Sequence, residues 1–196
     1  MLKRIFDIMF SIFGILFLIP FFLVISFIQI TSSGWPIFYL QTRVGLHGKD
    51  FKLFKFRTMA LNADQKGLLT VGGRDPRVTK FGYFLRKFKL DELPQLFNVV
   101  IGNMSLVGPR PEVRKYVDLY DSSQLAVLSV KPGITDYASL EFINENELLA
   151  TSIDAEHTYI YEIMPKKLKL NLEYIQDKNL ILDLKIILKT LLKIVI

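Results

Sequence analysis

Hydrophobic residues form an almost unbroken run near the start of the chain. From Ile5 to Ile30 the main interruptions are Asp7, Ser11, Gly14, Pro20, Ser26 and Gln29. At 1.5 Å per residue, a run of this length can cross a bilayer core of about 30 Å, so the pattern predicts a membrane helix. The residues after it offer only a weak signal-peptide cleavage site, so we expect the segment to be retained.

Two arrangements of this helix are open. A straight transmembrane helix is the simpler one. Pro20, however, removes a backbone hydrogen bond near the middle and favours a bend. Lys3 and Arg4 precede the segment and further basic residues follow it, so the positive-inside tendency places both flanks in the cytoplasm. We therefore predict a re-entrant membrane helix over residues 1–32 that bends at Pro20 and returns to the same face.

The pattern that follows mixes the periods of strands and helices and predicts a mostly helical α/β domain with a small sheet over residues 33–196. The predicted elements are strands at 37–40 and 51–57, a turn at 45–48, a loop over or beside the site at 62–75, helices at 79–90 and 93–100, and a polar surface segment at 144–157. Gly102 and Asn103 are expected to end the second of these helices.

The C-terminal residues predict an amphipathic helix over 179–196. This segment is strongly apolar, and Lys185, Lys189 and Lys193 repeat every four residues, which places one narrow basic stripe along a helix. Such a helix can lie in the membrane interface with its lysines near anionic headgroups. Docking against the core of the domain and a coiled-coil partner surface are the alternatives.

The charge of the chain narrows the class of ligand. Its 196 residues are 51% hydrophobic, yet the net charge is +6, a pairing that favours an anionic membrane surface or phosphorylated ligands. Nucleic acid is not expected as a partner, because zinc-ligand spacing, an RNA-binding aromatic signature and a basic tail are all missing. The chain contains no cysteine, which excludes disulfides and thiolate metal sites.

Two adjacent carboxylates, Asp91 and Glu92, are candidate functional residues. They lie close in sequence to three cations, Arg86, Lys87 and Lys89. Adjacent carboxylates repel one another and are tolerated where a divalent ion or basic side chains compensate them. One of the two can then act as ligand or nucleophile. A solvated charge cluster at a helix start is the alternative interpretation.

Further basic residues point toward a phosphate. Prolines 109 and 111 bracket Arg110 in a stiff turn, which suits bidentate phosphate contact, although a solvent-exposed loop arginine fits the same pattern. One face of the strand over 51–57 is expected to carry Lys52, Lys55 or Arg57 toward solvent or ligand; strict alternation fails at Leu53-Phe54, so the basic residues at its two ends need not share a face. His47, a single histidine in a turn, is not expected to be a ligand.

Several motifs, in order, resemble the bacterial sugar transferase family of monotopic polyprenol-phosphate phosphoglycosyl transferases. The resemblance covers nearly the whole chain. The matching stretches are Lys3-Arg4 with Asp7, then Gln41, Arg43 and Gly45, then 55–59, 75–82, 90–97, 108–111, 132–135 and 182–185.

The resemblance implies a reaction and a place. A sugar-1-phosphate would pass from a UDP-sugar to polyprenyl (undecaprenyl) phosphate with release of UMP and would initiate a lipid-linked glycan, with Mg²⁺ as cofactor. The enzyme would sit on the cytoplasmic face of the bacterial inner membrane, with both ends of its re-entrant helix in the cytoplasm. Downstream membrane glycosyltransferases and self-association are compatible with it. The absence of further apolar spans leads us to expect the minimal form of the family.

The resemblance also implies residue roles. Asp91 would be the nucleophile of a ping-pong mechanism, forming a covalent phosphosugar intermediate, and would bind Mg²⁺. Glu92 would help position or deprotonate the lipid phosphate. The substrate-binding residues would be Lys55, Arg57, Arg86, Arg110 and Thr135.

The chain departs from the family pattern at two places. Ile19 precedes Pro20 where relatives often carry serine, and residues 136–142 differ from the glycine, glutamine and asparagine pattern of many relatives. Selectivity for the sugar or nucleotide could lie in 136–142; the sugar itself cannot be read from the chain. Two other functions stay open: a non-catalytic membrane-surface binding protein, and a polyprenyl phosphate phosphatase.

Overall fold

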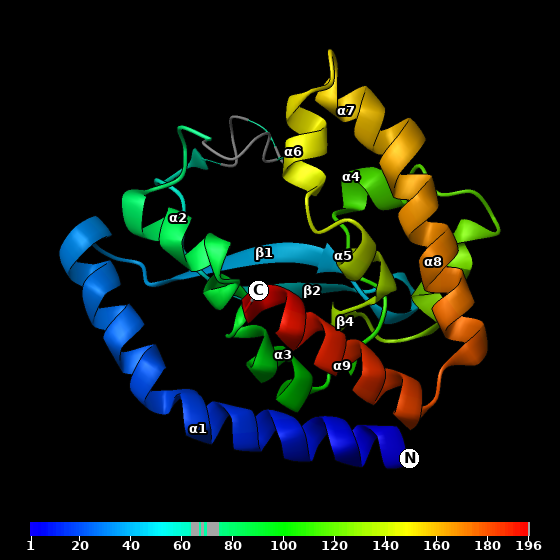
Figure 1. The fold of residues 1–196 in the computed structure, drawn as a ribbon, viewed down its shortest axis with the longest axis horizontal. Helices are drawn as coiled ribbons and strands as arrows, with labels where there is room; N and C mark the ends of the chain where they lie inside the picture. Colours follow the sequence, from blue (N-terminus) through cyan, green and yellow to red (C-terminus); the bar gives the residue numbers. More distant parts are fainter. Residues whose placement is uncertain (64–66, 68, 70–74, 196) are drawn as a thin grey trace.

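The computed structural model describes residues 1–63, 67, 69 and 75–195, with side chains to 193. Figure 1 shows its helices arranged around a long hairpin, with the first helix along the lower edge. The helices are α1 (Leu2–Ser33), α2 (Lys80–Lys87), α3 (Gln95–Ile101), α4 (Arg114–Val117), α5 (Tyr137–Glu141), α6 (Glu145–Ala150), α7 (Ala155–Thr158), α8 (Met164–Asp177) and α9 (Leu180–Val195). The strands are β1 (Phe38–Val44), β2 (Asp50–Phe56), β3 (Ser105–Val107) and β4 (Gly133–Thr135). Short helical turns are η1 (Leu46–Gly48), η3 (Leu90–Glu92), η4 (Gln124–Ser129) and the π-helical η5 (Tyr159–Ile163).

The prediction of a mostly helical domain with little sheet is confirmed. The described strands form two separate two-stranded sheets: an antiparallel β1–β2 hairpin and a parallel β3–β4 pair. In the hairpin Phe38 lies opposite Phe56 and Val44 opposite Asp50. In the parallel pair Val107 lies opposite Thr135. This second pair matters for the site because Arg110 follows β3 closely.

Most predicted elements near the site are present, with shifted bounds. The first strand continues to Val44, and exposed and partly buried residues alternate along its whole length. Helix α2 begins after Thr79, whose side chain accepts a hydrogen bond from the Gly82 N–H and caps the helix. Helix α3 ends at Gly102, as expected, and this residue has a φ of 107°, which glycine adopts without strain.

Two other predicted segments have different outcomes. The polar segment at 144–157 carries α6 and the first part of α7, and it contributes Leu149 to the core, so it is more than a surface excursion. The prediction of a loop at 62–75 falls mostly outside the described residues.

The largest group of buried side chains lies among α4, η4, η5 and α8. Its members are Val113, Tyr116, Val127, Leu149, Tyr159, Ile163, Met164 and Leu168. A second group joins α9 to β3 through Ile186 and Val107. A third group joins the second half of α1 to α2 through Ile25 and Leu85. The first and last helices are therefore both part of the packed structure.

Helix α1 is bent, with Pro20 inside it, and its two arms flank the rest of the molecule (Figure 1). Its buried residues are Asp7, Ser11, Ile25 and Gln29. Successive members are four, fourteen and four residues apart, close to whole numbers of helical turns, which places them along one stripe of the helix that faces the domain. Most of the other side chains are apolar and exposed. Among the described residues α1 is the one helix whose length and composition would allow it to cross a membrane.

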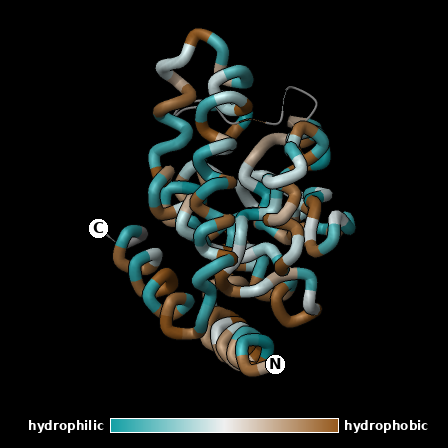
Figure 2. Tube along the Cα trace, turned by 90° about the vertical axis from the view of Figure 1, so that its right-hand side faces the viewer, coloured by the Kyte–Doolittle hydropathy of each residue, from teal (hydrophilic) through white to brown (hydrophobic). Residues whose placement is uncertain are grey.

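The start of α1 is held by polar contacts to three other elements. Lys3 pairs with Asp183 of α9. Arg4 donates to the carbonyl oxygens of Val99 and Val100, at 2.6 and 3.1 Å, and so satisfies the last turn of α3. In Figure 2 the helix that ends at the C label lies at the same end of the molecule as the N label, in agreement with the Lys3 contact.

Asp7 adds the contact to β3. Its carboxylate accepts hydrogen bonds from the Ser105 hydroxyl at 2.8 Å and from the Leu106 N–H at 3.1 Å. Asp7 is buried, so this polar residue in the apolar run is explained by a partner within the protein.

Arg57 holds the far end of α1. Its guanidinium donates to the carbonyl oxygens of Ser33, Gly34 and Pro36 at 2.7, 2.6 and 2.8 Å. Since the last carbonyls of a helix have no partner within the helix, this side chain supplies them with donors. Both ends of the bent helix are thus bonded to the same folded domain.

Helix α9 has two faces. Asp183 and Ile186 point into the protein, with exposed fractions of 1% and 0%. Ile181, Leu184, Leu188, Leu191 and Leu192 are exposed, and so are Lys185 and Lys189. The inner face of α9 is therefore docked against the core, which was one of the alternatives for this segment. The outer face keeps the apolar and basic composition that an interfacial helix requires.

Candidate active site

The two adjacent carboxylates lie in the short turn between α2 and α3. Lys89, the residue before this turn, has a φ of 55°, in the left-handed region that non-glycine residues seldom adopt. The turn η3 then carries Leu90, Asp91 and Glu92. Strained residues of this kind cluster at functional sites, where the surrounding structure holds them.

Two cations bind the Glu92 carboxylate. It accepts both terminal nitrogens of Arg110, at 2.6 and 3.3 Å, and Nζ of Lys55 at 2.9 Å. Burial alone would raise the pKa of Glu92, but Arg110 and Lys55 outweigh burial and hold that pKa well below its usual value. Glu92 is therefore a fixed anion at neutral pH.

The same interactions shift the pKa values of the two cations. Glu92 raises the pKa of Arg110 above its usual value. Burial lowers the pKa of Lys55, with Glu92 acting in the opposite direction. Three groups from β2, η3 and the loop after β3 thus form one ion-paired unit.

Asp91 differs from its neighbour. It is 7% exposed, and it accepts no hydrogen bond from any of the described residues. Burial, together with the charge of Glu92, raises its pKa, and Lys55, Arg86 and Lys89 oppose that rise. A buried carboxylate that lacks a hydrogen bond is costly to a fold and is a physical marker of a functional group.

Arg86 approaches the pair from the end of α2. Its Nε donates to the Thr58 hydroxyl at 2.8 Å, and its charge acts on Asp91. Burial lowers the pKa of Arg86, and the charge of Asp91 opposes this. The structure therefore brings together five of the predicted residues: Lys55, Arg86, Asp91, Glu92 and Arg110.

Arg57 and Thr135 make their contacts elsewhere. Arg57 directs its donors to the end of α1, as described above. Thr135 shares a hydrogen bond of 2.6 Å with Thr190, which ties β4 to α9. Substrate binding by these two residues stays a prediction.

Two residues that support the site were not singled out from the sequence. Asn98, fully buried in α3, accepts from the Phe54 N–H at 2.9 Å and donates to the Lys52 carbonyl at 2.7 Å, which fixes the strand that carries Lys55. Asp136 binds the backbone of Arg110 at 3.1 Å. Asp136 stands three residues before Ser139, at a position where aspartate caps the start of a helix. This capping pattern was the signal available in the sequence.

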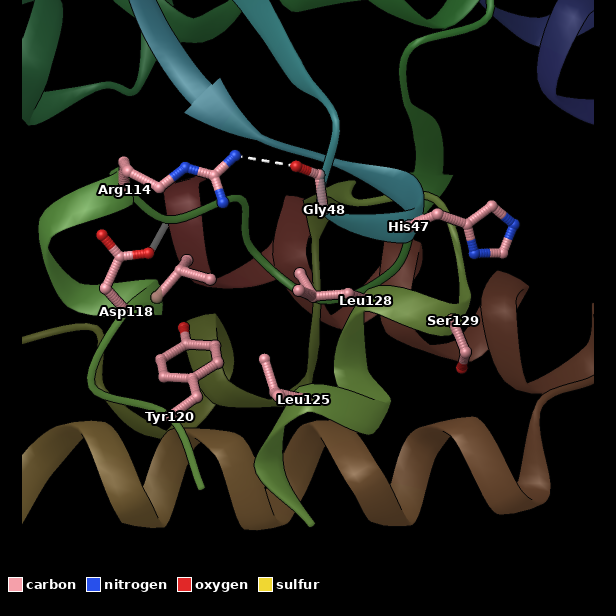
Figure 3. A pocket seen from close by; sticks show the side chains of 9 residues that line it. His47, Gly48, Arg114, Asp118, Tyr120, Leu125, Leu128 and Ser129 are labelled. Atoms are coloured by element: carbon pink, nitrogen blue, oxygen red, sulfur yellow. Dashed lines mark hydrogen bonds between the residues drawn. The ribbon is translucent and has the colours of Figure 1, made fainter. Parts of the chain in front are cut away.

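A hollow on the described surface lies away from these residues. Figure 3 shows an open depression of about 590 Å³ beyond the β1–β2 turn. It is lined by His47, Gly48, Arg114, Val117, Asp118, Tyr120, Leu125, Leu128 and Ser129. Arg114 is already engaged there with the Gly48 carbonyl, and none of the predicted site residues lines the hollow. The candidate site is therefore assigned from its charged groups and not from this hollow.

Magnesium fits the residues present. Mg²⁺ is usually bound by one or two carboxylates together with substrate phosphates, so it does not need a cage of protein ligands. The described residues contain no cluster of three acidic or histidine side chains that could form such a cage. Glu92 is occupied by its two cations, which leaves Asp91 as the carboxylate available to an ion.

Comparison with known proteins identifies the family of the chain. The family model described as bacterial sugar transferase matches residues 1–196. The chain belongs to the bacterial sugar transferase family. The resemblance drawn from the sequence motifs is thereby confirmed, and the protein is an enzyme of the transferase class.

Three relatives illustrate the family. An uncharacterized sugar transferase, EpsL, of Bacillus subtilis is 38% identical over 195 residues, which cover all of this chain and 88% of the relative. A UDP-N-acetylgalactosamine-undecaprenyl-phosphate N-acetylgalactosaminephosphotransferase of Aeromonas hydrophila is 36% identical, over 97% of this chain and 43% of the relative. A UDP-glucose:undecaprenyl-phosphate glucose-1-phosphate transferase of Escherichia coli is 37% identical, over 98% and 40%. The chain thus spans less than half of the two relatives whose names specify a reaction.

Proposed function

We propose that this sugar transferase moves a sugar-1-phosphate from a UDP-sugar to a polyprenyl phosphate and releases UMP. The names of the relatives support this reaction class for the region they share with the chain. The observation that carries the proposal is the contrast within the carboxylate pair. Glu92 is fixed by Arg110 and Lys55, whereas Asp91 is buried, has a raised pKa and accepts no hydrogen bond from the described residues.

The reaction runs in two displacements. A carboxylate oxygen of Asp91 attacks the β-phosphorus of the donor, the bond from that phosphorus to the bridging oxygen breaks, and UMP leaves. The enzyme then carries a phosphosugar ester on Asp91. An oxygen of the polyprenyl phosphate attacks the same phosphorus, and Asp91 leaves as a carboxylate. The product is a polyprenyl diphosphate sugar, and the kinetics are ping-pong.

The cations stabilise charge during both displacements. Arg110, Arg86 and Lys55 lie around the pair and can bind the oxygens of the transferring phosphoryl group, where one such charged contact is worth about a hundredfold in rate or more. Mg²⁺, held by Asp91 and the diphosphate, would neutralise negative charge that would otherwise repel the carboxylate. Glu92 positions Arg110 and Lys55, and it can also orient the incoming lipid phosphate.

We further propose that the enzyme lies on the cytoplasmic face of the inner membrane through a re-entrant α1. Both ends of α1 are bonded to one domain, through Lys3, Arg4 and Asp7 at the start and through Arg57 at the end. A straight 32-residue helix would separate its ends by about 48 Å and place them across a bilayer. The apolar outer faces of α1 and α9 would contact the lipid, where the acceptor phosphate lies.

The absence of cysteine allows a clean test of this topology. Single cysteines introduced as Leu2→Cys and Ser32→Cys in spheroplasts should both resist a membrane-impermeant maleimide, and both should react after the membrane is opened. Labelling of one position and not the other in intact spheroplasts would indicate a straight span.

The reaction is tested by UMP release. Purified wild type and Asp91→Asn are incubated with Mg²⁺, undecaprenyl phosphate and a panel of UDP-sugars, with Asp50→Asn as a control because Asp50 is exposed on the hairpin. We expect lipid-dependent release with one donor, abolished by Asp91→Asn alone, and a labelled adduct on the wild type when the acceptor is omitted. No release with any donor would favour the membrane-surface binding protein. Phosphate release from undecaprenyl phosphate without a UDP-sugar would indicate the phosphatase.

A further inference from the structure

Asp136 lies at the point where β4 passes into α5, and it is completely buried. One carboxylate oxygen accepts the N–H of Ser139 at 2.7 Å and caps α5. The other oxygen accepts the N–H of Arg110 at 3.1 Å. One side chain therefore joins the start of a helix to the residue whose guanidinium holds Glu92.

The backbone around this contact is tightly joined. The Gly108 N–H donates to the Thr135 carbonyl at 3.1 Å, and the Gly133 N–H donates to the Pro109 carbonyl at 3.0 Å. A Cβ atom on Gly133 would lie only 2.1 Å from the Gly108 nitrogen, so the two segments touch through backbone atoms. The hydrogen bond from the Arg110 N–H to Asp136 is the last of these contacts, and it holds the backbone of Arg110 itself.

Arg110 needs such a tie, because its side chain is long and about one third exposed. Its guanidinium binds Glu92 through two nitrogens, and that fit is sensitive to where the Arg110 backbone lies. We propose that Asp136 is a positioning residue for Arg110, which fixes the backbone from which the guanidinium reaches Glu92 and the phosphoryl group. This role rests on the proposed function.

The chain offers a matched control. Asp154 caps α7 in the same manner, accepting the N–H groups of Glu156 and His157 at 3.0 Å, but it is exposed and has no bond to Arg110. Alanine at either position removes a helix cap. Only Asp136→Ala also releases Arg110. Asp136→Asn is a third variant. Asparagine caps a helix about as effectively as aspartate, but it has only one side-chain oxygen and so cannot accept the two N–H groups on separate oxygens.

The experiment measures kcat and the donor KM of UMP release for these variants. We expect Asp136→Ala to lower kcat by about tenfold to a hundredfold, the loss typical of a misplaced catalytic group, with KM changed less than threefold. Asp136→Asn should melt close to the wild type and still lose kcat. Asp154→Ala should retain wild-type kcat.

A double-mutant cycle separates positioning from a general loss of structure. In an Arg110→Ala background there is no guanidinium to position, so Asp136→Ala should lower the residual rate less than twofold. Multiplicative losses in the cycle, or wild-type kcat in both Asp136 variants, would overturn the positioning role while leaving the proposed function in place. Absence of lipid-dependent UMP release from the wild type itself would overturn both.

Discussion

Lys3 and Asp183 form an ion pair across 180 positions of the chain. Asp183 is buried, and its second oxygen accepts the Tyr174 hydroxyl at 2.7 Å, whereas Lys3 is about one third exposed. The pair joins the first turn of α1 to α9, and Tyr174 continues the contact to the Val107 carbonyl of β3. The bent helix is thus fixed to the part of the fold that leads to Arg110.

The unequal burial of this pair predicts unequal effects of mutation. Lys3→Ala leaves a buried carboxylate without its cation and should lower the free energy of unfolding by about 3–5 kcal/mol. Asp183→Asn leaves a lysine that can reach water and should cost less. The double variant should be more stable than Lys3→Ala alone. Urea unfolding in detergent measures these values, and simple addition of the two single effects would contradict the assignment.

The two adjacent carboxylates should affect stability in opposite directions. Glu92→Gln leaves Lys55 and Arg110, which are both partly buried, without their anion and should destabilise the fold by about 1–3 kcal/mol, the cost of unsatisfied polar groups. Asp91→Asn removes a buried charge that accepts no hydrogen bond from the described residues and should raise the melting temperature by about 2–4 °C, the shift expected for 1 kcal/mol in a chain of this size. Thermal unfolding at pH 7 in detergent tests both expectations, and a lower melting temperature for Asp91→Asn would count against this picture of the site.

The pH dependence of stability follows from the pKa shifts of Asp91 and Glu92. The folded pKa of Asp91 is raised, so the stability linked to its protonated form is present below its unfolded value of about 3.9 and is lost as the pH rises through the folded pKa. The advantage of Asp91→Asn should therefore vanish below about pH 4. The folded pKa of Glu92 is depressed, so its contribution is present above about pH 4.3 and is lost as the pH falls through the folded pKa. Melting curves from pH 3 to 8 distinguish the two carboxylates, and parallel pH profiles for both variants would contradict these assignments.

Removal of magnesium should act through Asp91. EDTA should abolish UMP release. In the absence of substrates, millimolar Mg²⁺ should raise the melting temperature of the wild type, because a bound cation offsets the cost of the buried carboxylate. Asp91→Asn should not respond, and Asp50→Asn should respond like the wild type. An equal shift in all three proteins would place the ion elsewhere.

Arg57 offers a test between two roles. Its donors satisfy three carbonyl oxygens at and after the end of α1, so Arg57→Lys should lower the free energy of unfolding by about 1.5–3 kcal/mol, the value of a hydrogen bond to a charged group. The kcat/KM of the folded variant should stay within about threefold of the wild type. A large loss of kcat/KM without loss of stability would instead support the substrate-binding role predicted from the sequence.

The candidate site residues could be selected from the sequence because their pattern is local. The carboxylate pair and its neighbouring cations are adjacent along the chain, and the proline-bracketed Arg110 is a short motif. The alternation in 51–57 likewise located β2, because the side-chain period of a strand is visible over seven residues.

What the sequence could not show depends on contacts between distant residues. Arg57 has the same charge whether it binds a phosphate or a helix end, and only the fold brings Ser33 to it. Asp7 and Gln29 appear in the sequence as isolated polar residues of a membrane segment. Their common stripe toward the protein becomes visible only when α1 is placed against α3 and β3.

The Arg57 contact also has a consequence for how the enzyme is made. The donors that close α1 come from a residue 24 positions after Ser33, and the partners of Asp7 and Lys3 lie 98 and 180 positions after those residues in the chain. The apolar segment is therefore synthesised before any of these partners. We expect the isolated segment to behave as an ordinary apolar span, and the topology of the finished protein to be acquired when the domain folds.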